Sequence, residues 1–191
     1  MRPKLLLDID GILTDFHAAI ARVATEAGFP ITTDRMVEWE MSASLRQAGA
    51  PEQIVDLCMC AMASDGFNAV LDPDPAALEN LPALQEIADV MFVTSPNPKC
   101  SSWMSERIDW MRQYFDIQPL QIVFSCEKHL ISGDGFVDDN PENVLYWARS
   151  HPEKTAALWD APYNRNARVQ RRLRSWPELL DFARFLKLRS S

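Results

Sequence analysis

Two aspartates separated by a single residue, Asp8 and Asp10, follow an apolar run near the start of this 191-residue chain. Residues i and i+2 of an extended strand point in the same direction, so both carboxylates can face one point. Two like charges about 4 Å apart repel by about 4 kcal/mol at an effective dielectric constant of about 20, and a divalent cation would relieve that repulsion. The pair therefore indicates a metal-assisted site, unless the two aspartates only cap a helix or a turn.

Polar side chains also follow the later apolar runs. Thr94 and Ser95 close the second run, where hydroxyls and free backbone N–H groups suit phosphate oxygens, although Ser95 could instead cap the next helix. Lys128 follows the third run and would supply the local cation that an acidic protein needs beside an anionic substrate, although a single lysine is usually a surface residue. Asp138 and Asp139 end the fourth run, where adjacent carboxylates are costly unless they bind a partner such as a hard cation.

The elements that would position these residues can be read from the apolar runs, at residues 5–9, 90–94, 122–125, 136–137 and 155–159. Their apolarity is continuous rather than alternating, which is typical of buried parallel strands. Helical stretches at 101–115 and 141–150 separate the later runs. The first of these has an apolar face made of Met104, Ile108, Met111 and Phe115. The alternation predicts a Rossmann-like, doubly wound parallel α/β sheet with the polar residues at its ligand-binding edge.

A long segment separates the first two predicted strands, where one crossover helix would suffice. Helices are expected in it at 18–27, 34–47 and 51–63, with turn signals near residues 28–30 and 72–75. We therefore expect residues 1–16 and 79–191 to form an α/β core domain and residues 17–78 to form a small helical cap, inserted after the first strand.

The composition fits a folded globular protein, with 47% apolar and 24% charged residues. A net charge of −8 and a pI of about 4.9 oppose binding to nucleic acid polymers and to anionic membranes. We interpret the short basic run at residues 168–174 as a solvated helix face. No apolar run approaches the roughly 18 residues that a membrane helix needs.

The four cysteines lack paired C-x-x-C spacing, and no secretory signal precedes the first apolar run. We interpret Cys58 and Cys60 as buried thiols rather than half of a metal site, because no second half with matching spacing is present. These features predict a reduced, cytoplasmic setting.

Taken together, the motifs resemble the haloacid dehalogenase (HAD) superfamily: D-x-D-G-x-L-T from Asp8, T-S from Thr94, Lys128, and G-F-V-D-D up to Asp139. Within it, the chain is most similar to the cytosolic and mitochondrial 5′(3′)-deoxyribonucleotidases and their bacterial and phage relatives. That closer similarity depends on F-V-T-S-P, on the spacing from Lys128 to the acid pair, on W-D-A-P-Y-N at 159–164 and on R-S-W at 174–176. It spans nearly the whole chain except the cap. The first and last motifs are specific together, whereas the hydroxyl and lysine motifs are weak singly.

The resemblance implies a Mg²⁺-dependent phosphomonoester hydrolase, a 5′-nucleotidase acting on ribo- or deoxyribonucleoside monophosphates. Asp8 would attack phosphorus to form an aspartyl-phosphate, and Asp10 would first protonate the leaving oxygen and then activate water. Mg²⁺ would be held by Asp8, by the backbone carbonyl of Asp10 and by one of Asp138 and Asp139, of which Asp139 is favoured. The other phosphate oxygens would be held by Thr94, Ser95 and Lys128.

The resemblance also places specificity in the cap, which would close over the substrate and exclude water. Phe16, Trp39 and Phe67 could stack on a nucleobase there, or could belong to the core of the cap. Because the cap departs from the family pattern, the deoxypyrimidine preference of the animal enzymes is not expected to carry over. Relatives are often homodimers, and the sequence leaves the oligomeric state open.

Three other interpretations remain. The same chemistry could serve a sugar phosphate or another small ester. A receiver-like signalling domain also gathers acids, a hydroxyl and a lysine around magnesium, but its phosphorylated acid lies at a middle strand, where this chain has hydroxyls. A pseudo-enzyme would keep the fold without turnover, which the complete polar set disfavours. Dehalogenation is disfavoured because dehalogenating members lack an acid at the place of Asp10.

Overall fold

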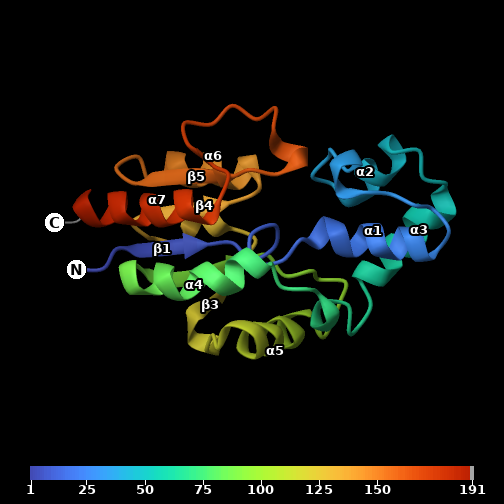
Figure 1. Ribbon diagram of the computed structural model, residues 1–191, viewed down its shortest axis with the longest axis horizontal. Coiled ribbons are helices and arrows are strands. Elements are labelled where there is room, and N and C mark those ends of the chain that lie inside the picture. Colours follow the sequence, from blue (N-terminus) through green and yellow to red (C-terminus); the bar gives the residue numbers. More distant parts are fainter. Residues whose placement is uncertain (190–191) are drawn as a thin grey trace.

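The computed structural model describes residues 1–189, and a six-stranded parallel sheet lies at its centre (Figure 1). The strands are β1 (Lys4–Leu7), β2 (Asp89–Thr94), β3 (Ile122–Phe124), β4 (Gly135–Asp138), β5 (Thr155–Trp159) and β6 (Arg172–Leu173). Their order is β3-β2-β1-β4-β5-β6, and every neighbouring pair is parallel. The predicted doubly wound α/β fold is therefore confirmed. The winding reverses between β1 and β4, where open sheets of this kind bind ligands.

Successive residues of the central strands face two different hydrophobic layers. Leu5 and Leu7 pack with α4 (Pro75–Ile87), α5 (Trp103–Phe115) and α7 (Trp176–Arg189), whereas Leu6 packs with α6 (Pro141–Ser150) on the other face. Both sheet faces are thus covered, which explains why consecutive residues inside these strands, such as Leu5, Leu6 and Leu7, are all apolar.

Capping residues begin the helices that leave the carboxyl edge of the sheet. The Asp15 carboxylate accepts from the Ala18 N–H at the start of α1 (Phe16–Glu26), and the Asn140 side chain accepts from the Glu142 N–H at the start of α6. Pro141 occupies the first turn of α6, where its missing N–H costs nothing. Local sequence therefore determines where these helices begin beside the site.

The segment between β1 and α4 contains α1, α2 (Met41–Gln47), α3 (Glu52–Met62) and the 3₁₀ turns η1 (Thr33–Arg35) and η2 (Asn68–Val70). Figure 1 shows α1, α2 and α3 beside the sheet rather than over either face. They share a hydrophobic cluster of their own that includes Ile20, Leu45 and Val55. The division into a core and a cap at 17–78 stays a prediction, and its second boundary falls inside α4.

Some local expectations were wrong. The helix expected at 34–47 is interrupted, because the Glu40 carboxylate accepts from the Ser42 and Ala43 N–H groups and starts α2 anew. On α5, Met104 is 48% exposed, while Trp103, Arg107 and Trp110 are buried. Met111 is fully buried, and Ile108 and Phe115 pack against the core, so the expected face is wrong only at Met104. The face also contains the buried Arg107, which an apolar pattern does not reveal.

Two further expectations also need correction. The basic run at 168–174 is not helical: it contains β6, which the sequence did not predict, and Arg172 forms an ion pair of 2.7 Å with Asp160. Cys58 is buried as expected, but Cys60 is exposed. Within residues 1–189, the helices are all too short or too polar to cross a bilayer.

Candidate active site

A cavity of about 400 Å³ lies where the carboxyl edge of the sheet meets the inserted helices. This volume is in the range of small-molecule sites. The sheet side of its lining includes Asp8, Asp10, Thr94, Ser95, Lys128 and Asp139. The side of the inserted segment includes Phe16, His17, Trp39, Met41, Met59 and Met62. Two predicted site residues, Asp138 and Phe67, do not belong to the lining.

Lys128 is a buried cation rather than a surface lysine. It begins the 3₁₀ turn η4 (Lys128–Leu130), and only 3% of the side chain is exposed. Its Nζ lies 2.8 Å from Asp8 Oδ2 and 2.8 Å from Asp138 Oδ2. Burial alone would lower the pKa of Lys128, but the carboxylates of Asp138 and Asp8 raise it by more. The lysine therefore stays charged at the floor of the cavity.

Asp138 uses its carboxylate to hold other residues in place. Besides Lys128, its oxygens accept from the Asn140 N–H at 2.7 Å and from Asn143 Nδ2 at 3.2 and 3.1 Å. The Asp138 carboxylate oxygens are thus engaged by these donors, and Asp138 does not line the cavity. Its role is therefore to orient Lys128.

Asp139 faces the cavity and is held by the loop after β5. The Tyr163 hydroxyl donates to Asp139 Oδ2, and Asn164 Nδ2 donates to the Asp139 backbone carbonyl at 2.7 Å. Burial, followed by repulsion from Asp138, raises the pKa of Asp139 to about 7. The W-D-A-P-Y-N segment, which the sequence marked only as a similarity, thus anchors a carboxylate of the site.

Asp8 completes a group of carboxylates that could share a cation. Burial, followed by repulsion from Asp138, raises the pKa of Asp8 well above its usual value. Oxygens of Asp8, Asp138 and Asp139 all lie within 4.8 Å of one another. One lysine does not offset three buried acids, and the all-oxygen donor set fits a hard divalent cation.

Asp10 lies on the same cavity with a different set of neighbours. Its side chain is 28% exposed, and its Oδ1 accepts from Arg107 Nη2 at 2.8 Å. Arg107 belongs to α5 and is fully buried. The sequence offered no signal for it, because one arginine in a helix is ordinarily a surface residue.

Gly11 allows the chain to turn between Asp10 and Thr14. Its φ is +77°, and a Cβ there would lie 2.1 Å from Asp139 Oδ2 and 2.9 Å from the Tyr163 hydroxyl. We expect Gly11→Ala to destabilise the protein by more than about 1 kcal/mol and to reduce activity, because the methyl group displaces Asp139.

The matched control for this change is Gly28→Ala. Gly28 has a φ of +91°, but among the described residues no heavy atom lies within 4 Å of the added Cβ. It therefore carries the backbone strain without the clash. Urea unfolding and phosphate release from both variants measure the difference, and equal losses in the two would contradict the assigned contact.

The hydroxyls after β2 are available to a ligand. Thr94 Oγ1 is buried and has no hydrogen-bond partner within residues 1–189. Ser95 Oγ donates to the Ser125 carbonyl at 3.3 Å, and the helix that follows is preceded by Ser102 rather than by Ser95 or Asn97. The helix-cap interpretation of Ser95 is thus not supported.

The aromatic candidates separate into two groups. Phe16 and Trp39 line the cavity, and 53% of Trp39 is exposed. Phe67 instead packs edge-on against Phe16, with ring centroids 5.4 Å apart. His17, which the sequence did not single out, stacks on Tyr163 with centroids 4.2 Å apart.

Comparisons with known proteins agree with this geometry. The family model described as "5' nucleotidase, deoxy (Pyrimidine), cytosolic type C protein" matches residues 2–189. The mitochondrial 5′(3′)-deoxyribonucleotidase of Homo sapiens is 31% identical over 191 residues, covering 92% of this chain and 79% of the relative. The cytosolic type of Homo sapiens is 27% identical over 194 residues, covering 95% and 94%. Because these relatives are named for different compartments, the cytoplasmic location stays a prediction.

Solved structures share the fold at low identity. A haloacid dehalogenase-like hydrolase from Burkholderia xenovorans has a TM-score of 0.61 at 12% identity, with 96% of this chain and 97% of that chain covered. A hydrolase of the haloacid dehalogenase-like family from Streptococcus pneumoniae has a TM-score of 0.59 at 14% identity, with 94% and 97% covered. The resemblance found in the sequence is confirmed: the chain belongs to the 5′(3′)-deoxyribonucleotidase family and is a phosphoric monoester hydrolase on a haloacid dehalogenase-like fold.

Proposed function

We propose that the chain is a Mg²⁺-dependent 5′-nucleotidase that hydrolyses ribo- or deoxyribonucleoside monophosphates through an aspartyl-phosphate on Asp8. One observation carries this proposal: Asp8, paired with Lys128 at 2.8 Å, faces a cavity that Asp10 and Thr94 also line. In the described part of the chain, the Thr94 hydroxyl has no hydrogen-bond partner. A nucleophile, a proton donor and phosphate-binding groups therefore surround one space.

In the first step the Asp8 carboxylate attacks phosphorus, and the bond from phosphorus to the sugar oxygen breaks. Asp10 gives its proton to that oxygen, which leaves as the nucleoside hydroxyl. In the second step Asp10 takes a proton from water as the water attacks the aspartyl-phosphate, which releases inorganic phosphate and restores Asp8. Dividing the hydrolysis in this way gives Asp10 opposite roles in the two steps.

Charge on the phosphate has several compensating groups in the cavity. Lys128 and Thr94 would bind its oxygens, with Ser95 beside them. Mg²⁺, held by Asp8, Asp139 and the Asp10 carbonyl, would offset negative charge on the phosphoryl group. Asp139 is the better candidate for direct contact than Asp138, because Asp139 lines the cavity and Asp138 is occupied by Lys128, Asn140 and Asn143.

The cavity wall formed by the inserted segment fits a nucleoside better than a small sugar. Phe16, Trp39, Met59 and Met62 present apolar and aromatic surface there, on which a base can stack. A sugar phosphate would leave this surface without a partner, so it is the second candidate.

A substrate panel tests the proposal. Ribo- and deoxyribonucleoside monophosphates and common sugar phosphates are incubated with Mg²⁺, and released phosphate is measured. We expect release from nucleotides only. Release from sugar phosphates alone would keep the Asp8 chemistry and discard the nucleotide, whereas no release from any ester would favour a receiver-like or pseudo-enzyme domain.

Metal removal is expected to stop turnover reversibly. Chelation leaves Asp8 and Asp139 without a counter-cation, so activity should fall to background and return when Mg²⁺ is added. Mg²⁺ should also raise the unfolding temperature of the chelated protein in a concentration-dependent way, since a ligand of the folded state stabilises it. Full activity in chelator, or an unfolding temperature unmoved by Mg²⁺, would contradict the metal site.

A further inference from the structure

The guanidinium of Arg107 is buried between two tryptophan rings. Its Cζ lies 5.1 Å from the ring centroid of Trp103 and 5.5 Å from that of Trp110. The Trp110 indole N–H is itself fixed by the Leu71 carbonyl at 2.7 Å. A buried guanidinium is costly unless it is paired, and the ion pair of Arg107 is with Asp10.

Asn68 holds the same guanidinium from a second direction. Its Oδ1 accepts from Arg107 Nη2 at 3.2 Å, and Asn68 is fully buried. Within residues 1–189, Arg107 Nε and Nη1 have no hydrogen-bond partner. Arg107 Nη2, which donates to Asp10, is therefore also the nitrogen that Asn68 holds in place.

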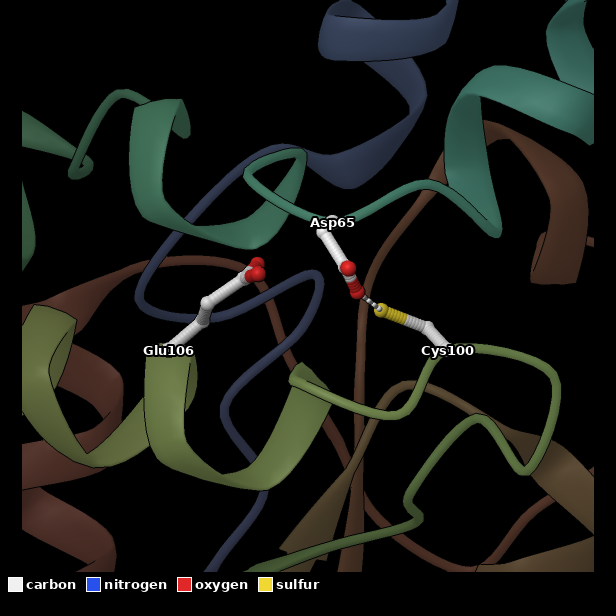
Figure 2. Close-up of side chains that lie close together, drawn as sticks. All are labelled: Asp65, Cys100 and Glu106. Atoms are coloured by element: carbon white, nitrogen blue, oxygen red, sulfur yellow. Dashed lines mark hydrogen bonds between the residues drawn. The ribbon is translucent and has the colours of Figure 1, made fainter.

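The neighbouring residue, Glu106, fastens the loop that carries Asn68. Its carboxylate accepts from the Gly66 N–H at 2.6 Å and from the Asn68 N–H at 3.1 Å. Figure 2 shows Glu106 and Cys100 reaching from the α5 side toward Asp65. These three residues could form a metal cluster, but the Glu106 carboxylate already accepts from the Gly66 and Asn68 N–H groups. The Ser102 hydroxyl lies within hydrogen-bond distance of both the Asp65 and the Glu106 carboxylates and can donate its one proton to either of them. The cluster therefore joins the loop to α5.

We propose that Arg107 is a positioning residue that holds the Asp10 carboxylate ready to protonate the leaving oxygen. This proposal rests on the proposed function of Asp10. Arg107 is absent from the cavity lining, so it acts through Asp10 rather than on substrate. By occupying Oδ1, the charge-assisted hydrogen bond leaves Oδ2 as the oxygen that carries the proton toward the ester.

Leaving-group dependence tests this role. A sugar alkoxide is strongly basic and needs the proton, whereas p-nitrophenolate departs without it. We expect Arg107→Met to lower kcat/KM for a nucleoside monophosphate by about 10²-fold, and to lower that for p-nitrophenyl phosphate far less. The value of kcat/KM depends only on the steps up to formation of the aspartyl-phosphate. The later activation of water by Asp10 therefore does not affect it. Equal losses on the two esters would overturn the proposal.

Two milder variants guard against a folding defect in Arg107→Met. Arg107→Lys keeps a cation and should recover part of the nucleotide rate, and Asn68→Ala should show a smaller loss with the same leaving-group pattern. In an Asp10→Asn background, Arg107→Met should cause no further loss on the nucleotide, because residues that act as a unit are not additive. A further loss there would show that Arg107 acts structurally.

The wild-type protein in the same assays tests the proposed function separately. If it hydrolyses a sugar phosphate but no nucleotide, the substrate assignment fails, and the Arg107 comparison is made between that sugar phosphate and p-nitrophenyl phosphate. If it hydrolyses neither kind of ester, both proposals are overturned.

Discussion

Replacing Asp8 with asparagine is expected to lower kcat by about 10⁴-fold or more while the protein stays folded. An amide is a poor nucleophile, so the aspartyl-phosphate cannot form. The amide oxygen can still accept from Lys128, and the side chain keeps its shape. Because burial and Asp138 already raise the pKa of Asp8, a neutral side chain should not lower the unfolding temperature. Single-turnover phosphate release and thermal unfolding measure the two effects.

Asp74→Asn provides the same chemical change away from the site. The Asp74 carboxylate accepts from the Ala76 and Ala77 N–H groups at the start of α4, and asparagine caps helices equally well. This variant should keep full activity. An Asp8→Asn protein that turns over within about tenfold of the Asp74→Asn protein would rule out Asp8 as the nucleophile.

Lys128→Met is expected to cost about 3–5 kcal/mol of unfolding free energy as well as activity. The lysine Nζ lies 2.8 Å from both Asp8 and Asp138, so its removal leaves two buried carboxylates without their cation. Denaturant unfolding in chelator measures the loss. Mg²⁺ should restore part of the stability, because it offsets the same charge.

Lys154→Met is the matched control for Lys128→Met. Lys154 Nζ pairs with Asp134 at 2.7 Å, but these side chains are 43% and 30% exposed. Exposed ion pairs contribute about 0–1 kcal/mol, so the control should lose little. Similar losses in the two lysine variants would mean that Lys128 is not the central charge of a buried network.

The acid pair at the end of β4 illustrates how the fold divides roles between neighbours. Asp138 and Asp139 are adjacent and chemically identical, yet Asp138 contacts Lys128 and Asn143, whereas Asp139 contacts Tyr163 and lines the cavity. Both carboxylates reach the group that also contains Asp8, and their different partners separate their roles. The sequence predicted the pair but could not derive this division of contacts.

Local expectations failed where long-range contacts override local pattern. The apolar pattern of α5 missed Arg107, which is buried on the same helix face as Trp103 and Trp110 and pairs with Asp10, 97 residues away in the chain. The strand β6 is only two residues long, too short to show a hydrophobic pattern, and it is defined by its pairing with β5. Such elements have no local signal.

The sequence by itself determined the doubly wound sheet, the family, and the sheet edge whose residues line the cavity. Each buried strand is a short apolar run, and polar residues such as Asp8, Thr94 and Asp138 follow directly where the strand ends. Parallel strands bring those ends together without further information. The apolar runs and the polar residues that follow them are local features of the chain, so they can be recognised in a single sequence.

Only the tertiary structure decided which groups hold these residues in place. Tyr163 contacts Asp139, Arg107 contacts Asp10, and Lys128 lies between Asp8 and Asp138. These contacts join residues 10 to 120 positions apart in the chain. Their partners are set by the packing of loops and helices against the sheet, and by the cost of burying a charge without a counter-charge. That cost depends on the distances between distant segments, which no local pattern in the chain expresses.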